Sequence, residues 1–165
     1  MPSPRKFPAS AFTGDTKHVE CLLEGMPRVV IEYSANLEAE IEPMRLVRAM
    51  HEAVLAQPIF EAPGVRTRVA RRKHFLIADG DPSHAFAAVT ARIGPGRAQE
   101  ARKSASEAIM AALYGVLEPI YQSRGLILSV EVTQLDGAGM TRRNSLRERA
   151  SKLVGSKGKS GCPKP

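Results

Sequence analysis

The spacing of apolar residues changes between the period of a strand and the period of a helix, and it does so in the same order twice. The β-branched run at residues 29–31, ended by the turn-forming residues 34–36, predicts a short buried strand. Residues 41–58 carry apolar side chains at helical spacing and predict an amphipathic helix. Residues 65–78 mix apolar and basic side chains before an Asp-Gly-Asp-Pro stop, and they predict a strand or a pair of strands.

The second unit repeats this order with a stronger helical signal. Residues 86–93 predict a further strand, and the turn at 94–97 leads into a helix. The apolar stripe of that helix consists of Ala105, Ala108, Ile109, Ala112, Leu113, Val116, Leu117 and Ile120. Residues 126–135 then alternate between apolar and polar side chains, as a half-buried strand does.

The duplicated strand–helix–strand pattern predicts an α+β fold. Each crossover joins two parallel strands through a helix, so two of them give a four-stranded mixed sheet with both helices on one face. The opposite face of the sheet would then be uncovered, and an exposed apolar face is typical of proteins that associate. We therefore expect a homo-oligomer.

Length and composition agree with one domain flanked by two end segments. A chain of 165 residues with 43% hydrophobic residues can bury a core without disulfides. Residues 1–25 contain prolines and no sustained period, and we expect a poorly ordered extension. Residues 140–165 hold eight basic residues and one acidic residue, which accounts for the whole net charge of +7. The domain at 26–139 is thus neutral overall. Residues 155–165 at the end of the basic tail have too few large apolar residues to order themselves, and we expect them to be disordered.

Cysteine usage and hydropathy indicate the compartment. Cys21 and Cys162 lie in opposite end segments and form no C-x-x-C motif. No apolar run approaches the roughly 20 residues of a membrane span, and residues 1–25 lack the apolar core of a secretory signal. These features predict a cytoplasmic protein with no membrane partner.

Two partial motifs do not support a metal or phosphate site. His51 and Glu52 would begin an H-E-x-x-H zinc motif, but Leu55 stands where the second histidine is required. The loop at 94–97 lacks the Gly-Lys-Ser/Thr ending of a P-loop and the third glycine of a dinucleotide fingerprint. We expect no metal and no cofactor.

Met26 followed by Pro27 is the pattern of an initiator methionine that is removed because the next residue is small. Removal would leave Pro27 with a free secondary amine, which can accept and return a proton. Inside a chain, the nitrogen of the same residue belongs to a planar amide and is not basic. Spacing alone favours the simpler interpretation that Pro27 opens a strand, a position that proline tolerates.

The run Pro-x-x-x-Ile-Glu-Tyr-Ser-Ala-Asn that begins at Pro27 resembles the start of 5-carboxymethyl-2-hydroxymuconate isomerases, members of the tautomerase superfamily, which begin with a catalytic proline. Residues 62–68 and the two segments 78–82 and 93–97 resemble the same family. The resemblance covers roughly residues 27–144. It departs from the family at Ala88, where many relatives carry histidine, and at Asn144-Ser145, where many carry two asparagines.

The resemblance implies a tautomerase-like fold, a homotrimer, and an isomerase of aromatic-acid catabolism. The substrate would be a conjugated dienol acid with several carboxylates, such as 5-carboxymethyl-2-hydroxymuconate, whose proton moves between the enol oxygen and a carbon. Pro27 would be the acid–base catalyst, provided that the mature chain begins there. Arg66 and Arg97 would bind carboxylates and stabilise the dienolate. These guanidinium groups, together with desolvation, would lower the pKa of the Pro27 amine toward the working pH.

A second function remains open from the sequence. If residues 1–25 are retained, Pro27 is an amide and the domain is a catalytically silent tautomerase-fold oligomer. Its basic tail would then bind an anionic partner such as nucleic acid, which is not expected of the neutral domain. Arg66 and Arg97 would be solvated charges, as most of the 24 lysines and arginines are. The mass of the purified polypeptide separates the two functions.

Overall fold

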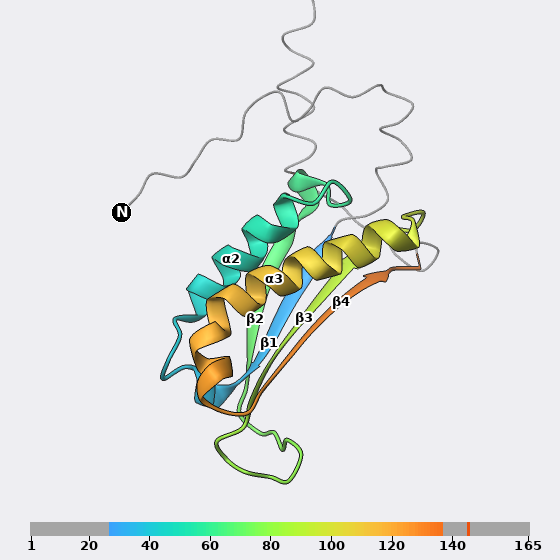
Figure 1. The fold of residues 1–165 in the computed structure, drawn as a ribbon. Helices are drawn as coiled ribbons and strands as arrows, with labels where there is room; N and C mark the ends of the chain where they lie inside the picture. Colours follow the sequence, from blue (N-terminus) through green and yellow to red (C-terminus); the bar gives the residue numbers. More distant parts are fainter. Residues whose placement is uncertain (1–26, 137–144, 146–165) are drawn as a thin grey trace, which may run out of the picture.

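The computed structural model describes residues 27–136 and residue 145 (Figure 1). In chain order the elements are β1 (Arg28–Ser34), η2 (Ala35–Leu37), α2 (Pro43–Leu55), η3 (Ala62–Gly64), β2 (Arg66–Arg72), β3 (Ala85–Ile93), α3 (Gln99–Ser123) and β4 (Leu126–Gln134). The predicted strands and both predicted helices are confirmed. Residues 65–78 form one strand rather than a pair, because the chain after Arg72 runs through bends and turns until β3 begins.

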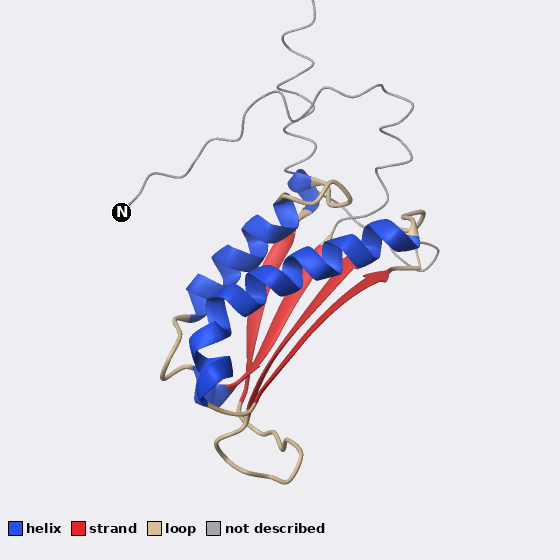
Figure 2. Cartoon of the chain, viewed as in Figure 1, coloured by secondary structure: helices blue, strands red, loops and turns tan. Residues whose placement is uncertain are grey.

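The four strands form one mixed sheet in the order β2-β1-β3-β4. The first strand of each unit is parallel to the second, so β1 pairs with β2 and β3 pairs with β4. The two units join through the antiparallel pair of β1 and β3 at the centre. Both helices cover the same face of this sheet (Figure 2). The expected duplicated β-α-β fold is thereby confirmed.

The core lies between the helices and the covered face of the sheet. Alternate residues of β1 point into it, and Val29, Ile31 and Tyr33 are buried. From α3 the predicted stripe contributes Ile109, Leu113 and other buried residues at helical spacing. This shared core explains why the two units, which contact each other through β1 and β3, form a single domain.

Both helices begin where the sequence permits a chain reversal. Pro43 occupies the first turn of α2, where its missing N–H group has no intrahelical partner to lose. Before α3, Gly96 adopts a φ of 83°, a conformation that side chains other than glycine's rarely tolerate. The loop from β3 to α3, which carries Arg97, is therefore shaped by that glycine.

The uncovered face of the sheet is not apolar, so one part of the argument for association was wrong. Strand alternation places on it the arginines Arg28, Arg66, Arg68, Arg72 and Arg92. The face also carries polar residues and only scattered apolar ones, because the residues between the buried positions of the strands are largely polar. Burial of an apolar layer is therefore not what this face offers to a second copy.

Apolar surface is instead exposed beside the edge strand β4. A groove of about 790 Å³ lies between α3 and β4, lined by residues that include Met110, Tyr114, Leu128 and Val130. Ile127, which also lines this groove, is 54% exposed. Because β4 pairs only with β3, its other edge has unpaired backbone groups within the described sheet. This edge is the apolar, unpaired part of the sheet surface.

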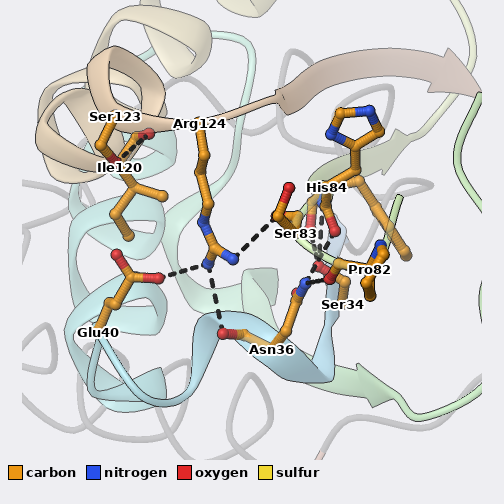
Figure 3. A network of polar contacts seen from close by, with 10 residues as sticks. Ser34, Asn36, Glu40, Pro82, Ser83, His84, Ile120, Ser123 and Arg124 are labelled. Atoms are coloured by element: carbon orange, nitrogen blue, oxygen red, sulfur yellow. Dashed lines mark hydrogen bonds and ion pairs between the residues drawn. The ribbon is translucent and has the colours of Figure 1, made fainter. Parts of the chain in front are cut away.

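A polar network ties the chain together at the end of the sheet where β1 ends and β3 and β4 begin (Figure 3). The Arg124 guanidinium donates to the carbonyl oxygens of Ser83 at 3.0 Å and Asn36 at 3.3 Å, and it forms an ion pair with Glu40. The Asn36 side chain donates to the carbonyl oxygen of His84 at 2.8 Å. These contacts join the end of α3, the loop before β3 and the turn after β1.

The expected extension at 1–25 and the expected tail at 140–165 lie outside the described residues, apart from residue 145. Within the described part of the chain, neither helix combines the length and the apolar character that a membrane crossing requires.

Candidate active site

The three predicted site residues lie at the end of the sheet opposite the polar network. β1 and β2 are parallel and both start at this end, whereas β3 is antiparallel to β1 and finishes there. Pro27 precedes β1, Arg66 begins β2, and Arg97 follows β3 in the loop to α3. Residues separated by up to 70 positions along the chain are thus placed at the same end of the sheet.

Pro27 is buried and is held by the backbone of the neighbouring strand. Its carbonyl oxygen accepts a hydrogen bond from the backbone N–H of Arg66 at 3.1 Å. This bond extends the β1–β2 ladder by one step, which the missing N–H of proline does not prevent because the carbonyl is the acceptor. Pro27 shares the strand parity of the buried Val29, so its ring belongs to the face that the helices cover.

Arg66 is joined to Pro27 through the backbone, but its side chain stands on the other face of the sheet. The register pairs Arg66 with Arg28, and partners across a ladder point to the same side. The side chain of Arg66 is exposed and has no ion pair among the described residues. A flexible arginine at the first position of an edge strand is free to turn toward a ligand at the sheet end.

Arg97 is the most enclosed of the predicted arginines and has a carboxylate partner. Its guanidinium lies 3.4 Å from a carboxylate oxygen of Glu61, and the two side chains are 18% and 19% exposed. Glu61 immediately precedes η3, which leads into β2. The carbonyl oxygen of Arg97 accepts a hydrogen bond of 2.6 Å from the side chain of Gln134 at the end of β4. Both ends of Arg97 are therefore anchored to other elements.

Sequence reasoning did not find Glu61 or Gln134. Glu61 is 36 residues from its partner Arg97, and no local pattern links an acid before a Pro-Gly turn to an arginine after a later strand. Gln134 was recognised only as part of the last strand. A hydrogen bond joins the backbones of Pro27 and Arg66. Arg97 lies at the same end of the sheet, where Glu61 and Gln134 hold it.

The residues at this end of the sheet are a buried proline and two arginines, one exposed on the opposite sheet face and one paired with Glu61. Within residues 27–136, no cluster of three or more histidine, cysteine, aspartate or glutamate side chains is arranged to hold a metal ion. Guanidinium groups favour carboxylates and other planar anions, which they meet with two parallel hydrogen bonds. The site is therefore suited to an anionic ligand whose reaction needs proton transfer or charge stabilisation.

Comparison with known proteins gives the same family at the level of sequence. The sequence pattern of the family described as 5-carboxymethyl-2-hydroxymuconate isomerase matches residues 27–150. The chain is 31% identical over 110 residues to 5-carboxymethyl-2-hydroxymuconate Delta-isomerase of Escherichia coli, an alignment that covers 67% of this chain and 87% of the relative.

Solved structures of the same family share the fold. A 5-carboxymethyl-2-hydroxymuconate isomerase from Deinococcus radiodurans R1 is 33% identical and superposes with a TM-score of 0.70, covering 76% of this chain and 95% of that one. A 5-carboxymethyl-2-hydroxymuconate delta-isomerase at 25% identity gives a TM-score of 0.69, with 76% of this chain and 93% of that one covered. The chain therefore belongs to the 5-carboxymethyl-2-hydroxymuconate isomerase family of the tautomerase superfamily.

Proposed function

We propose that this protein isomerises a conjugated dienol acid with several carboxylates, such as 5-carboxymethyl-2-hydroxymuconate, and that Pro27 transfers the proton. The observation that carries the proposal is that Pro27, Arg66 and Arg97 lie at the same end of the sheet, in a chain of the isomerase family. The reaction would serve aromatic-acid breakdown in the cytoplasm.

The proton transfer requires a free amine at Pro27. We therefore propose that the active chain begins at this residue and that residues 1–26 are absent from it. The neutral amine then removes the enol proton and returns it to a carbon of the same conjugated system. Burial at the start of β1 would favour the neutral form of this amine, which is the form that can accept a proton.

Arg66 and Arg97 have different tasks in this proposal. Arg97 is anchored by Glu61 and Gln134 and offers a preorganised positive charge to the developing dienolate. Arg66 is exposed and unpaired among the described residues, so it is available to bind a substrate carboxylate with two hydrogen bonds. Binding and charge stabilisation would be shared between them.

We also propose that the protein is a homotrimer and that the groove between α3 and β4 contributes to the contact. The family resemblance implies the trimer. The structure adds an edge strand with exposed Ile127 and a neighbouring apolar groove, which a second copy would remove from water.

The decisive experiment compares the full-length chain with a chain that begins at Met26. Mass spectrometry identifies the first residue of each, and an ultraviolet assay with 5-carboxymethyl-2-hydroxymuconate and with phenylenolpyruvate measures turnover. We expect the chain that starts at Pro27 to be active and the intact chain to be inactive, because a planar amide has no basic lone pair. Full activity of an intact chain whose mass includes residues 1–25 would falsify the proline mechanism.

The matched control is the Pro27→Ala variant of the trimmed chain. It retains a terminal amine but loses the rigid ring and the secondary amine. Circular dichroism should report an unchanged fold, since alanine also supplies the carbonyl acceptor for Arg66 and only the outer carbons of the buried ring are lost. A large loss of kcat in a folded variant assigns the chemistry to the proline.

A further inference from the structure

Three arginines stand side by side in one row across the uncovered face of the sheet. The β1–β2 register pairs Arg28 with Arg66, and the β1–β3 register pairs Arg28 with Arg92. Neighbouring strands are about 4.8 Å apart, so the three arginine side chains start from adjacent backbone positions. The fourth residue in the row, on β4, is Thr133, opposite Arg92.

No carboxylate pairs with this row among the residues that the structure describes. Neither Arg28, Arg66 nor Arg92 forms an ion pair or side-chain hydrogen bond within the described part of the chain. On the same face, Glu32 is engaged by Arg72, and Glu131 lies one pair further from the row, opposite Thr90. Like charges directly opposite each other in a sheet are destabilising. The arrangement therefore costs stability and concentrates positive potential at one place.

The row lies at the end of the sheet that carries the proposed active site. Arg28 directly follows Pro27, and Arg66 donates its backbone N–H to the Pro27 carbonyl oxygen at 3.1 Å. Arg92 is the last residue but one of β3, before the loop that carries Arg97. Each side chain is long enough to reach past the end of a strand from its first or last positions.

The charge of the proposed substrate decides what the row is for. 5-Carboxymethyl-2-hydroxymuconate has three carboxylates, two on the muconate chain and one on the carboxymethyl group. Arg66 and Arg97 supply two positive charges, and Glu61 cancels one of them. A trianion would thus meet one net positive charge. Adding Arg28 and Arg92 gives three net positive charges, which matches the substrate.

We propose that Arg28 and Arg92 extend Arg66 into a carboxylate-binding row that selects dienol acids with two or three carboxylates over those with one. This inference rests on the proposed isomerase function and names the substrate class of that site. The carboxylates distant from the reacting enol bind across the row. Binding energy from them holds the enol against Pro27, and a monocarboxylate cannot make those contacts.

The test is the substrate dependence of the Arg28→Gln and Arg92→Gln variants, measured in the form of the protein that turns over substrate. Losing a charge-assisted contact lowers kcat/KM for the tricarboxylate by about tenfold to a hundredfold. The loss with phenylenolpyruvate, which has one carboxylate, should be smaller by about a factor of ten or more. Equal losses with both substrates, or no loss with the tricarboxylate, overturn the proposal.

Arg68→Gln is the matched control, because Arg68 lies on the same face of β2, is exposed and has no ion pair among the described residues. Its row contains Val30 and Thr90 rather than arginines. We expect this variant to keep the wild-type preference for the tricarboxylate. A loss of that preference equal to the loss in Arg28→Gln would mean that overall charge, and not the row, selects the substrate.

Two further measurements separate this inference from folding and from the proposed reaction. The midpoint temperature of thermal unfolding without ligand should be no lower in Arg28→Gln than in the wild type, since a repulsive charge has been removed. If no dienol acid is turned over, the reaction proposal fails, and calorimetric titration with tricarballylate still tests the row. Binding that weakens at least tenfold in Arg28→Gln supports the row, and binding that is absent or unchanged overturns it.

Discussion

At the scale of single residues, the candidate site depends on how each charged group is partnered. Arg97 is paired with Glu61 and mostly enclosed, whereas Arg66 is exposed without an ion pair within residues 27–136. A partnered arginine has a restricted position, and a free one can follow its ligand. The two arginines that the sequence treats alike are therefore expected to respond differently to substitution.

Replacing Arg97 by Ala should lower kcat/KM for the dienol acid by about ten- to a thousandfold, because a preorganised electrostatic stabiliser is lost. Lysine should restore only part of it, since an ammonium group restores the charge but not the planar fork. Steady-state kinetics in the ultraviolet assay measures both. Arg45→Ala, on the exposed side of α2, is the control, and unchanged kinetics in Arg97→Ala would remove that residue from the site.

Tyr33 predicts a dependence of stability on alkaline pH. The hydroxyl of this buried tyrosine donates a hydrogen bond of 2.5 Å to Glu38, and desolvation, followed by this hydrogen bond, raises the pKa of Tyr33 from 10.0 to about 12. Above pH 10 the unfolded chain loses this proton before the folded chain does. The contribution of Tyr33 to the free energy of unfolding is therefore full below pH 10 and is lost as the pH rises toward 12.

Urea unfolding followed by circular dichroism, at steps between pH 8 and pH 12, measures this effect. Tyr33→Phe is the comparison, because it keeps the ring and removes the titrating group. The stability difference between wild type and variant should shrink across that range. A difference that stays constant from pH 8 to pH 12 would contradict the assignment.

At the scale of elements, α2 and α3 cover one face of the sheet and enclose a single core with it. The proposed site lies at one end of the sheet. The stripe of α3 packs in the shared core against β4 and α2, while the Arg124 network lies at the opposite end of the sheet (Figure 3). The proposed proton transfer would take place at the end where loops and strand starts meet. The opposite end is occupied by structural hydrogen bonds that fix the turns.

Leu113→Ala in the middle of α3 should destabilise the protein by about 2–5 kcal/mol, because Leu113 is fully buried and its removal leaves a cavity. Leu76→Ala makes the same chemical change at a side chain that is 89% exposed, and it should shift stability by less than about 0.5 kcal/mol. Chemical denaturation of both variants provides the comparison. Similar losses at the two positions would mean that the α3 stripe is not the core.

At the scale of the whole molecule, the surface divides into an arginine-bearing sheet face and an apolar β4 edge. The first carries like charges that disfavour contact with the same face of a second copy, and the second has exposed Ile127 and unpaired strand atoms within the described sheet. Association through the edge is therefore the arrangement that the proposed trimer requires.

Sedimentation velocity should give a species of three times the mass of the chain used, which is 17.9 kDa for all 165 residues and smaller for a chain that begins at Pro27. Ile127→Asp should shift it toward the monomer, because the contact would have to bury an unpaired charge. The same change at exposed Leu76, which lies in the loop before β3, should leave the trimer intact. A wild-type protein that sediments as a stable monomer would refute the trimer.

The sequence by itself determined the order of the elements and the buried side of the helices. The period of the apolar residues placed both helices and all four described strands, because local spacing decides which side chains can share one buried surface. The Pro27 segment and the arginine-bearing segments also identified the family, since these motifs are contiguous in the chain.

Only the tertiary structure decided what lies beside what across the sheet. The row of Arg28, Arg66 and Arg92 exists because of strand register, and register depends on contacts between segments far apart in the chain. The Arg97–Glu61 pair spans 36 positions for the same reason. Residue spacing also could not reveal that the uncovered face is charged while the apolar surface lies at β4. The location of the apolar surface depends on which strand lies at the edge of the sheet, and the packing of the whole domain determines that strand order.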